Sequence, residues 1–142
     1  MAEYHLTVPL QDRDITKLVI GDIVYFSGQA WTCRSRLQKY IFDDGQALPF
    51  STTEKNLLIH VGPIMIQEEN RWKPVSFQPT SSIRFEKWGP RSIQEWGLKA
   101  IVGKTTMGKA TSEAMKQYHC IHATPLGVTP NLFIKRFEVD GV

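Results

Sequence analysis

The stretch GLKAIVGKTTMG, residues 97–108, places a mainly apolar run directly before a loop that carries a cation. The run at 98–102 predicts a buried strand, and Gly103 and Lys104 begin the loop that follows it. Beyond the loop, Thr111 is suited to cap a helix that runs to Tyr118, and residues 119–124 predict another strand. This order of strand, loop, helix and strand predicts an α/β unit in the later half of the chain.

The earlier half of the chain is richer in predicted strands. Apolar or alternating runs predict strands at 4–8, 23–26, 57–61 and 72–77, with a polar hairpin tip at 67–71. Amphipathic spacing predicts a helix at 34–43, and Pro90 and Gly97 mark the start and end of another. A turn of helix is expected within 12–18, and a further element is expected at 132–139. The predicted fold class is therefore α/β, with mixed β structure joined to α/β units in one domain that spans residues 1–142.

Composition excludes several classes of protein. The 142 residues are 42% hydrophobic and 22% charged, which are ordinary values for a globular domain with a real core. The net charge of +3 is small and the basic residues are scattered, so no nucleic-acid surface is expected. The first ten residues, MAEYHLTVPL, lack a basic segment followed by an apolar one, and no run is long enough to span a membrane. We therefore expect a cytoplasmic protein with no membrane partner.

Polar side chains gather in three short runs, each next to a segment that reads as a buried strand. The runs are GQAWTCR at 28–34, QPTSSIR at 78–84 and GKTTMG at 103–108. They contribute the cations Arg34, Arg84 and Lys104, and the hydroxyl of Thr80. Cations and hydroxyls at strand ends converge readily on a small anion, and three positive charges exceed the need of one carboxylate. A dicarboxylate ligand is therefore predicted.

Two other kinds of site are disfavoured by spacing. A phosphate-binding loop needs a glycine five places before Gly103, where Leu98 stands, and the residues between are predicted to form a strand. His119 and His122 point to opposite faces of a predicted strand, so they are not expected to share a metal ion with Cys120. His60, inside another predicted strand, is most simply a core histidine with a satisfied hydrogen bond.

The cysteine count limits the cofactor chemistry of this chain. Cys33 and Cys120 are its only cysteines, and reduced thiols are a better interpretation than a disulfide because nothing else resembles a secreted protein. Two cysteines cannot supply the thiolates that an iron–sulfur cluster normally requires. If a cluster takes part in the chemistry, another chain must hold it.

Four segments in register resemble the smaller half of the iron–sulfur hydro-lyases, which is the β subunit or C-terminal domain of class I fumarate hydratase and of L-tartrate dehydratase. The segments are residues 20–35, 57–63, 78–84 and 97–108, and the resemblance extends from about residue 7 to residue 125. It implies a swivelling β/β/α domain, a C4 dicarboxylate substrate, and an α subunit that holds a 4Fe-4S cluster. It also implies an assembly of the α2β2 type.

The resemblance assigns roles to individual side chains. Thr80 and Lys104 take the catalytic positions, Thr80 abstracting a proton and Lys104 helping to bind the substrate or its negatively charged intermediate. Arg34 and Arg84 are implied to bind the carboxylates, and the neighbouring hydroxyls of Ser81 and Ser82 are expected to contact substrate as well.

Six positions depart from the family pattern. Ser35 and Gln38 stand where an aspartate and a histidine are usual, Gln78 replaces a glycine, Ser81 replaces a threonine but keeps a hydroxyl, and Thr105 and Thr106 replace two more glycines. These departures keep open an alternative function as a catalytically inactive paralogue that binds a dicarboxylate or a partner protein. A purely structural subunit is the third possibility. The sequence does not choose among fumarate, tartrate and methylated analogues.

Overall fold

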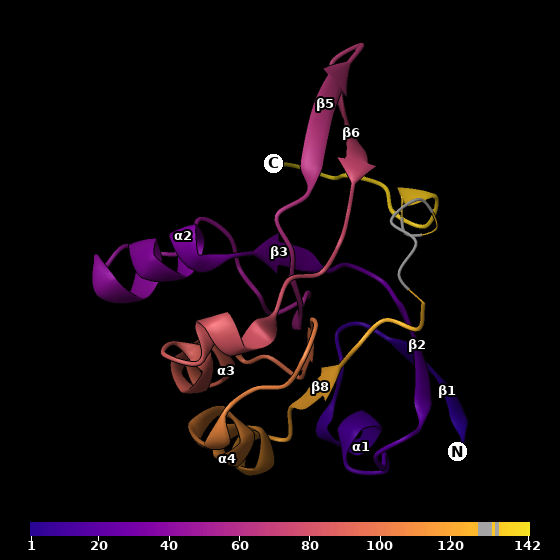
Figure 1. The fold of residues 1–142 in the computed structure, drawn as a ribbon, viewed down its shortest axis with the longest axis vertical. Coiled ribbons are helices and arrows are strands. Elements are labelled where there is room, and N and C mark those ends of the chain that lie inside the picture. Colours follow the sequence, from indigo (N-terminus) through magenta and orange to yellow (C-terminus); the bar gives the residue numbers. More distant parts are fainter. Residues whose placement is uncertain (128–131, 133) are drawn as a thin grey trace.

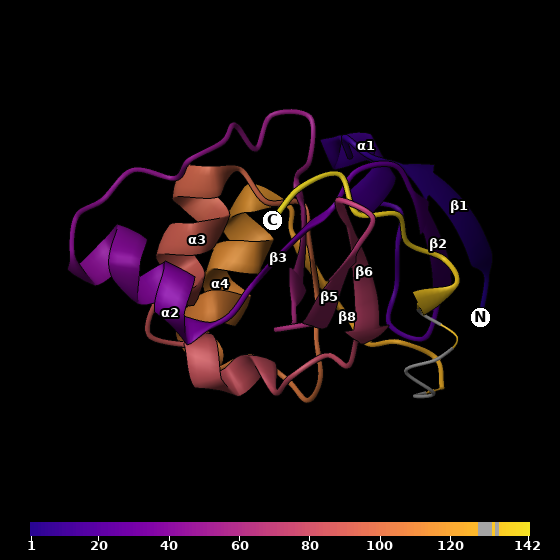
Figure 2. The ribbon, with the colours of Figure 1, turned by 90° about the horizontal axis from the view of Figure 1, so that it is seen from above.

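The structure is a computed structural model that describes residues 1–127, 132 and 134–142 (Figure 1). A central parallel sheet separates a layer of helices from a small second sheet, as Figure 2 shows from above. The prediction of a mixed α/β fold is confirmed. The assignment to the swivelling β/β/α domain class and the extent of the domain over residues 1–142 remain predictions. In the described part of the chain, no helix is long and apolar enough to cross a membrane.

The central sheet is parallel throughout and has the strand order β3-β4-β7-β8. Its strands are β3 (Trp31–Cys33), β4 (Leu57–His60), β7 (Ala100–Val102) and β8 (Ile121–Ala123). All four residues of β4 are buried, which explains why its sequence is a continuous apolar run. The predicted strands at 57–61 and 98–102 are confirmed in slightly shorter form as β4 and β7, whereas β3 was not predicted because a threonine interrupts its short sequence, WTC, and leaves no apolar run.

The helices cover one face of the central sheet (Figure 2). They are α2 (Ser35–Gln38), which continues into the π-helix η1 (Lys39–Asp43), α3 (Gly89–Trp96) and α4 (Lys109–Tyr118). Leu58 and Ile101 belong to the core between the sheet and these helices. Their neighbours Leu57 and Ala100 belong to a second core on the opposite face of the sheet. This alternation is the period of two that a strand requires. The predicted helix at 34–43 is confirmed in extent, but its second half is π-helical.

A two-stranded parallel sheet and a short helix form the layer on the other face. They are β1 (Glu3–Thr7), β2 (Ile23–Ser27) and α1 (Asp12–Ile15). Asn56 ties this layer to the central sheet, because its amide accepts a hydrogen bond from Leu10 N and donates one to Leu10 O, each 2.8 Å long. The interpretation of β2 as a buried strand is wrong: Tyr25 is 45% exposed, because the small sheet is covered on one face only. α1 also ends earlier than the predicted 12–18.

A β-hairpin projects from the body of the domain (Figure 1). It consists of β5 (Ile64–Glu68) and β6 (Arg71–Ser76), and the turn between them places Glu69 and Asn70 at positive φ. The predicted polar hairpin tip is therefore confirmed, but it is shorter than the predicted 67–71, because residues 67, 68 and 71 belong to the strands. The predicted element at 132–139 includes residue 133, which lies outside the described residues, and Ile134 and Phe137 pack near the base of the hairpin.

The beginning of α4 corrects one prediction. The helix begins at Lys109, two residues before the predicted cap Thr111, and Gly108 is its N-cap. Thr111 is buried inside the first turn and donates a hydrogen bond of 2.6 Å to Glu86. The Glu86 carboxylate also accepts from Gly108 N at 2.7 Å. Glu86, which follows the short 3₁₀ helix η2 (Ser82–Phe85), therefore accepts hydrogen bonds from two backbone N–H groups at the beginning of α4, those of Gly108 and Thr111.

Candidate functional site

The candidate site lies at the carboxyl edge of the central sheet. Parallel strands bring their carboxyl ends to one edge, and open α/β sheets bind ligands there. Arg34 follows β3 directly, and Lys104 follows β7 after one glycine. The predicted cations at 34 and 104 are thus both placed at this edge by the fold.

The segment at 78–84 crosses the same edge and is fixed to it by the backbone. Thr80 N donates to His60 O at 2.8 Å, Lys104 N donates to Thr80 O at 3.1 Å, and Ser82 N donates to Lys104 O at 2.8 Å. Ser81 and Lys104 form an isolated parallel bridge. The structure therefore brings Thr80, Ser81 and Lys104 together, although 23 residues separate Ser81 from Lys104 along the chain.

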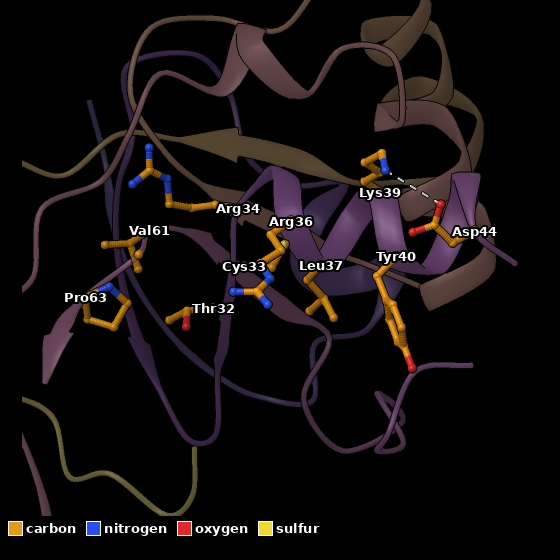
Figure 3. Close-up of a pocket in the computed structure, with 11 residues that line it drawn as sticks. Thr32, Cys33, Arg34, Arg36, Leu37, Lys39, Tyr40, Asp44, Val61 and Pro63 are labelled. Atoms are coloured by element: carbon orange, nitrogen blue, oxygen red, sulfur yellow. Dashed lines mark ion pairs between the residues drawn. The ribbon is translucent and has the colours of Figure 1, made fainter. Parts of the chain in front are cut away.

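The side chain of Arg34 lies over the end of β4, where Gly62 leaves room for it. Arg34 is the N-cap of α2, as the predicted position at the start of a helix requires. A Cβ at Gly62 would lie 2.5 Å from Arg34 Cδ, so any larger residue would displace the arginine. Figure 3 shows Arg34 pointing to the side where Val61 and Pro63 lie. Gly62 thus determines where this guanidinium can lie.

A cleft of about 630 Å³ opens beside Arg34, between the end of β4 and the exposed side of α2 and η1 (Figure 3). Arg34, Arg36 and Lys39 line it together with one carboxylate, that of Asp44. Lys39 and Asp44 form an ion pair of 3.7 Å at the end of the cleft away from Arg34. The cleft is therefore positively charged on the side of Arg34.

The predicted cations are exposed and have no carboxylate partner among the described residues. Arg84 lies in η2 and Lys104 in the loop after β7, and both side chains are exposed, as is Arg34. None of the three forms an ion pair within the part of the chain that the structure describes. Unpaired guanidinium and ammonium groups around one sheet edge can bind an anion without first breaking an internal salt bridge.

A buried hydroxyl lies below this surface, between two imidazoles. Ser82 Oγ is 2.9 Å from His60 Nδ1 and 2.9 Å from His122 Nε2. Ser82 is fully buried, unlike Ser81, so its hydroxyl faces the two histidines and not the surface where a substrate contact was expected. Burial lowers the pKa of His60 to about 3 and also lowers the pKa of His122, so both rings are neutral at pH 7. The prediction of a core histidine at 60 is confirmed.

The other potential ligands lie apart, but not through the strand geometry that the spacing predicted. His119 is the C-cap of α4, not part of a strand, and its Nδ1 lies 3.0 Å from Asp12, whereas His122 faces Ser82. The predicted strand at 119–124 is thus shorter, and the two histidines do not converge. No group of three or more histidine, cysteine, aspartate or glutamate side chains in the described residues is placed to hold a metal ion.

Both thiols are unsuited to bind metal in this structure. Burial raises the pKa of Cys33 and that of Cys120 to about 12, which keeps them protonated at neutral pH, whereas metals bind the thiolate. The two cysteines are unpaired and lie in the core between the sheet and the helices. The residues of this chain therefore do not fit a resident iron–sulfur cluster.

Thr105 has a backbone conformation that favours glycine. Its φ is +62°, in the left-handed region, which is costly for a β-branched residue. It stands where the family pattern has a glycine. The loop after Lys104 thus keeps the shape that a glycine would adopt easily, although the side chain has changed.

Thr105→Gly is expected to raise the free energy of unfolding by about 1 kcal/mol. Relief of the left-handed conformation is worth about 1–2 kcal/mol and outweighs the greater entropy of glycine in the unfolded chain. Urea denaturation of the isolated chain measures this change. Thr106→Gly is the matched control, because Thr106 does not have a positive φ. That variant should have a lower free energy of unfolding than the wild type. Equal destabilisation by both variants would contradict the prediction.

The fold and the site together define an α/β domain whose central sheet has exposed cationic side chains at its carboxyl edge. Residues 2–137 match the family described as Fumarase C-terminus, and the chain belongs to that family. The L(+)-tartrate dehydratase subunit beta of Escherichia coli K12 is 31% identical over 117 residues, which are 82% of this chain and 58% of that protein. The chain thus spans less than two thirds of the length of this relative.

Two further relatives come from other organisms. A protein of Methanocaldococcus jannaschii named "Putative L(+)-tartrate dehydratase subunit beta" is 33% identical over 94% of this chain and 70% of its own length. A Geobacillus stearothermophilus protein named "Putative fumarate hydratase class I" is 29% identical over 96% of this chain and 26% of its own length. The family resemblance predicted from the sequence is confirmed.

Proposed function

We propose that this chain is the β part of a hydro-lyase that adds water to, or removes it from, a C4 dicarboxylate of the fumarate or tartrate type. Support comes from membership of the fumarase C-terminus family and from relatives named as dehydratase and hydratase. The observation that carries the proposal is the set of three cations, Arg34, Arg84 and Lys104, without ion-pair partners in the described residues, at an edge that also holds Thr80.

The cations hold the substrate in this proposal. Arg34 and Arg84 bind the two carboxylates, for which the planar guanidinium fork is well matched. Lys104 steadies the negative charge that develops on the aci-carboxylate when a proton is removed beside it. Ser81 adds a hydroxyl at the same edge, whereas Ser82 is buried below it.

Thr80 removes the proton in this proposal. A free hydroxyl is a poor base at neutral pH, so the alkoxide has to be stabilised by nearby positive charge. The backbone of Lys104 is hydrogen-bonded to Thr80 O at 3.1 Å, and Arg84 lies in the adjoining η2. Both cations are therefore fixed to the same short segment as the hydroxyl that they would activate.

A partner α subunit holds the 4Fe-4S cluster in this proposal, because the two buried thiols of this chain do not fit one. When bound, such a cluster supplies a Lewis acid for the hydroxyl that leaves as water. The names of the relatives as subunit beta support a partner subunit. We further propose an assembly of the α2β2 type that works in the cytoplasm.

Co-expression of this chain with a cluster-bearing α subunit under anaerobic conditions tests the proposal. Hydration of fumarate and dehydration of L-tartrate are followed by absorbance for the complex and for each subunit alone. Turnover of one substrate by the complex, and none by either subunit alone, is the expected result. An iron-loaded complex that turns over neither substrate, nor a methylated analogue, would overturn the proposal.

A second function, as a dicarboxylate-binding module without catalysis, is favoured by the environment of Gln38. This residue stands where the family pattern has a histidine, and it is buried, with Nε2 3.6 Å from Cys33 Sγ. Its amide is therefore turned into the core and not toward the carboxyl edge. Titration calorimetry of the isolated chain with fumarate and malate distinguishes the binding module from the hydro-lyase subunit. If the chain binds these dicarboxylates but no complex that contains it turns them over, the binding module is favoured.

A further inference from the structure

Ser82 lies beneath the candidate site and contacts the ends of three neighbouring strands. In the sheet order, β7 lies between β4 and β8, and Ser82 sits over the end of β7. A Cβ at Gly103 would lie only 1.9 Å from Ser82 Oγ, so the hydroxyl rests directly on the backbone that follows β7. From there it reaches His60 on β4 and His122 on β8. One side chain thus links all three neighbouring strands.

The backbone of the same residue is linked to the groups proposed to act on substrate. Ser82 N donates to Lys104 O, and Lys104 N donates in turn to Thr80 O. Arg84 lies two residues further along, within the helical turn η2 that Ser82 begins. A shift of Ser82 would therefore move Thr80, Lys104 and Arg84 together.

The hydrogen bonds of the hydroxyl need both imidazoles to be correctly protonated. A serine hydroxyl has one proton, so it can donate to only one ring and must accept from the other. Either His60 Nδ1 carries a proton and His122 Nε2 accepts, or the reverse. His60 is buried and His122 is partly buried, and this burial favours the neutral form of both rings. A neutral imidazole has one nitrogen that donates and one that accepts, so either arrangement pairs both ring nitrogens that face the hydroxyl.

We propose that Ser82, held between His60 and His122, is a positioning residue that keeps Thr80, Arg84 and Lys104 in register for the chemical step. The catalytic part of this inference rests on the proposed hydro-lyase function. The cations that Ser82 positions are exposed and long, so their aim depends on the backbone that carries them. A displacement of about 1 Å in such groups can cost about 100-fold in rate.

Ser82→Ala in the assembled enzyme is the first test. We expect kcat to fall by about 10- to 100-fold, with a smaller change in KM because Arg34 lies on another segment and still binds one carboxylate. Ser92→Ala is the matched control: Ser92 is similarly buried and donates a hydrogen bond of 2.8 Å to Gly89 O within α3, and in the described part of the chain its hydroxyl is not hydrogen-bonded to Thr80, Arg84 or Lys104. It should lose stability and keep its kcat.

Variants of His122 separate positioning from packing. His122→Gln retains an amide that can donate or accept near the place of Nε2, and should keep most of kcat. His122→Leu fills similar space without a hydrogen bond and should resemble Ser82→Ala. If kcat is normal in Ser82→Ala, or falls equally in the Gln and Leu variants, the inference is overturned.

Amide hydrogen exchange of the isolated chain tests the same inference without reference to catalysis. Exchange at Thr80, Ser82 and Lys104 should accelerate at least about 10-fold in Ser82→Ala and stay unchanged in Ser92→Ala, because loss of the hydroxyl loosens this segment only. Unchanged exchange at these amides would overturn the inference. If the wild-type complex has no activity, the proposed function fails, and the positioning by Ser82 is then judged by exchange alone.

Discussion

Arg84→Ala is expected to lower kcat/KM of the assembled enzyme by about 100-fold, which corresponds to about 3 kcal/mol of transition-state binding. The guanidinium has no ion-pair partner in the described part of the chain, so its loss removes an interaction with substrate and breaks no internal salt bridge. Its exposure in η2 also means that the fold should be kept. Steady-state kinetics with fumarate and L-tartrate measure the effect.

Arg13→Ala is the control for this variant. Arg13 is an exposed arginine on α1, and α1 adjoins the opposite edge of the sheet, where Asp12 is 2.6 Å from Lys99 at the beginning of β7. Removing its charge should leave the kinetics unchanged. Wild-type kinetics in Arg84→Ala would refute the carboxylate-binding role, while an equal loss in Arg13→Ala would indicate a general effect of charge.

Trp96→Ala is expected to lower the free energy of unfolding by about 3–5 kcal/mol. Trp96 is 6% exposed and lies in the core between the helices and the central sheet. Its ring meets Trp31 edge-on at a centroid distance of 5.0 Å and stacks on Phe42 at 4.7 Å. Truncation leaves a cavity that the rigid sheet cannot close, and it removes both aromatic contacts. Urea denaturation monitored by circular dichroism measures the loss.

Trp72→Ala is the matched control, because the same substitution is made at an exposed place. Trp72 lies on the projecting hairpin and is 40% exposed, so the expected cost is below about 1 kcal/mol. Similar losses from the two variants would contradict the assignment of Trp96 to the principal core. If Trp72→Ala lost stability and Trp96→Ala did not, the principal core would lie around the hairpin.

Much of the sheet could be predicted from the sequence, because β4 and β7 are buried on both faces and their residues are almost all apolar. β3 could not, since the threonine inside its sequence, WTC, leaves no apolar run, and the strand is recognised by its pairing with β4. The partial exposure of β2 was also missed, because an apolar, aromatic strand in a two-stranded sheet has the same composition as one in a central sheet.

The cations of the candidate site were predicted from their positions after strands, but the buried hydrogen bonds beneath them were not. The link between His60 and His122 through Ser82 joins residues 22 and 40 apart in the sequence. No local pattern marks such a contact, and each histidine alone looks like an ordinary core residue. Gly62 and Gly103 were missed for the same reason: only the folded chain shows which side chain occupies the space beside each glycine.

The exposure of Arg34, Arg84 and Lys104 has a consequence for how ionic strength acts on this site. Charges in contact with water are screened over about 8 Å at physiological salt, so the attraction of the uncovered edge for a dianion weakens steeply as salt is added. A surface that covers the edge and excludes water would remove most of that screening. The steepness of the salt dependence therefore measures how completely a partner encloses these three side chains.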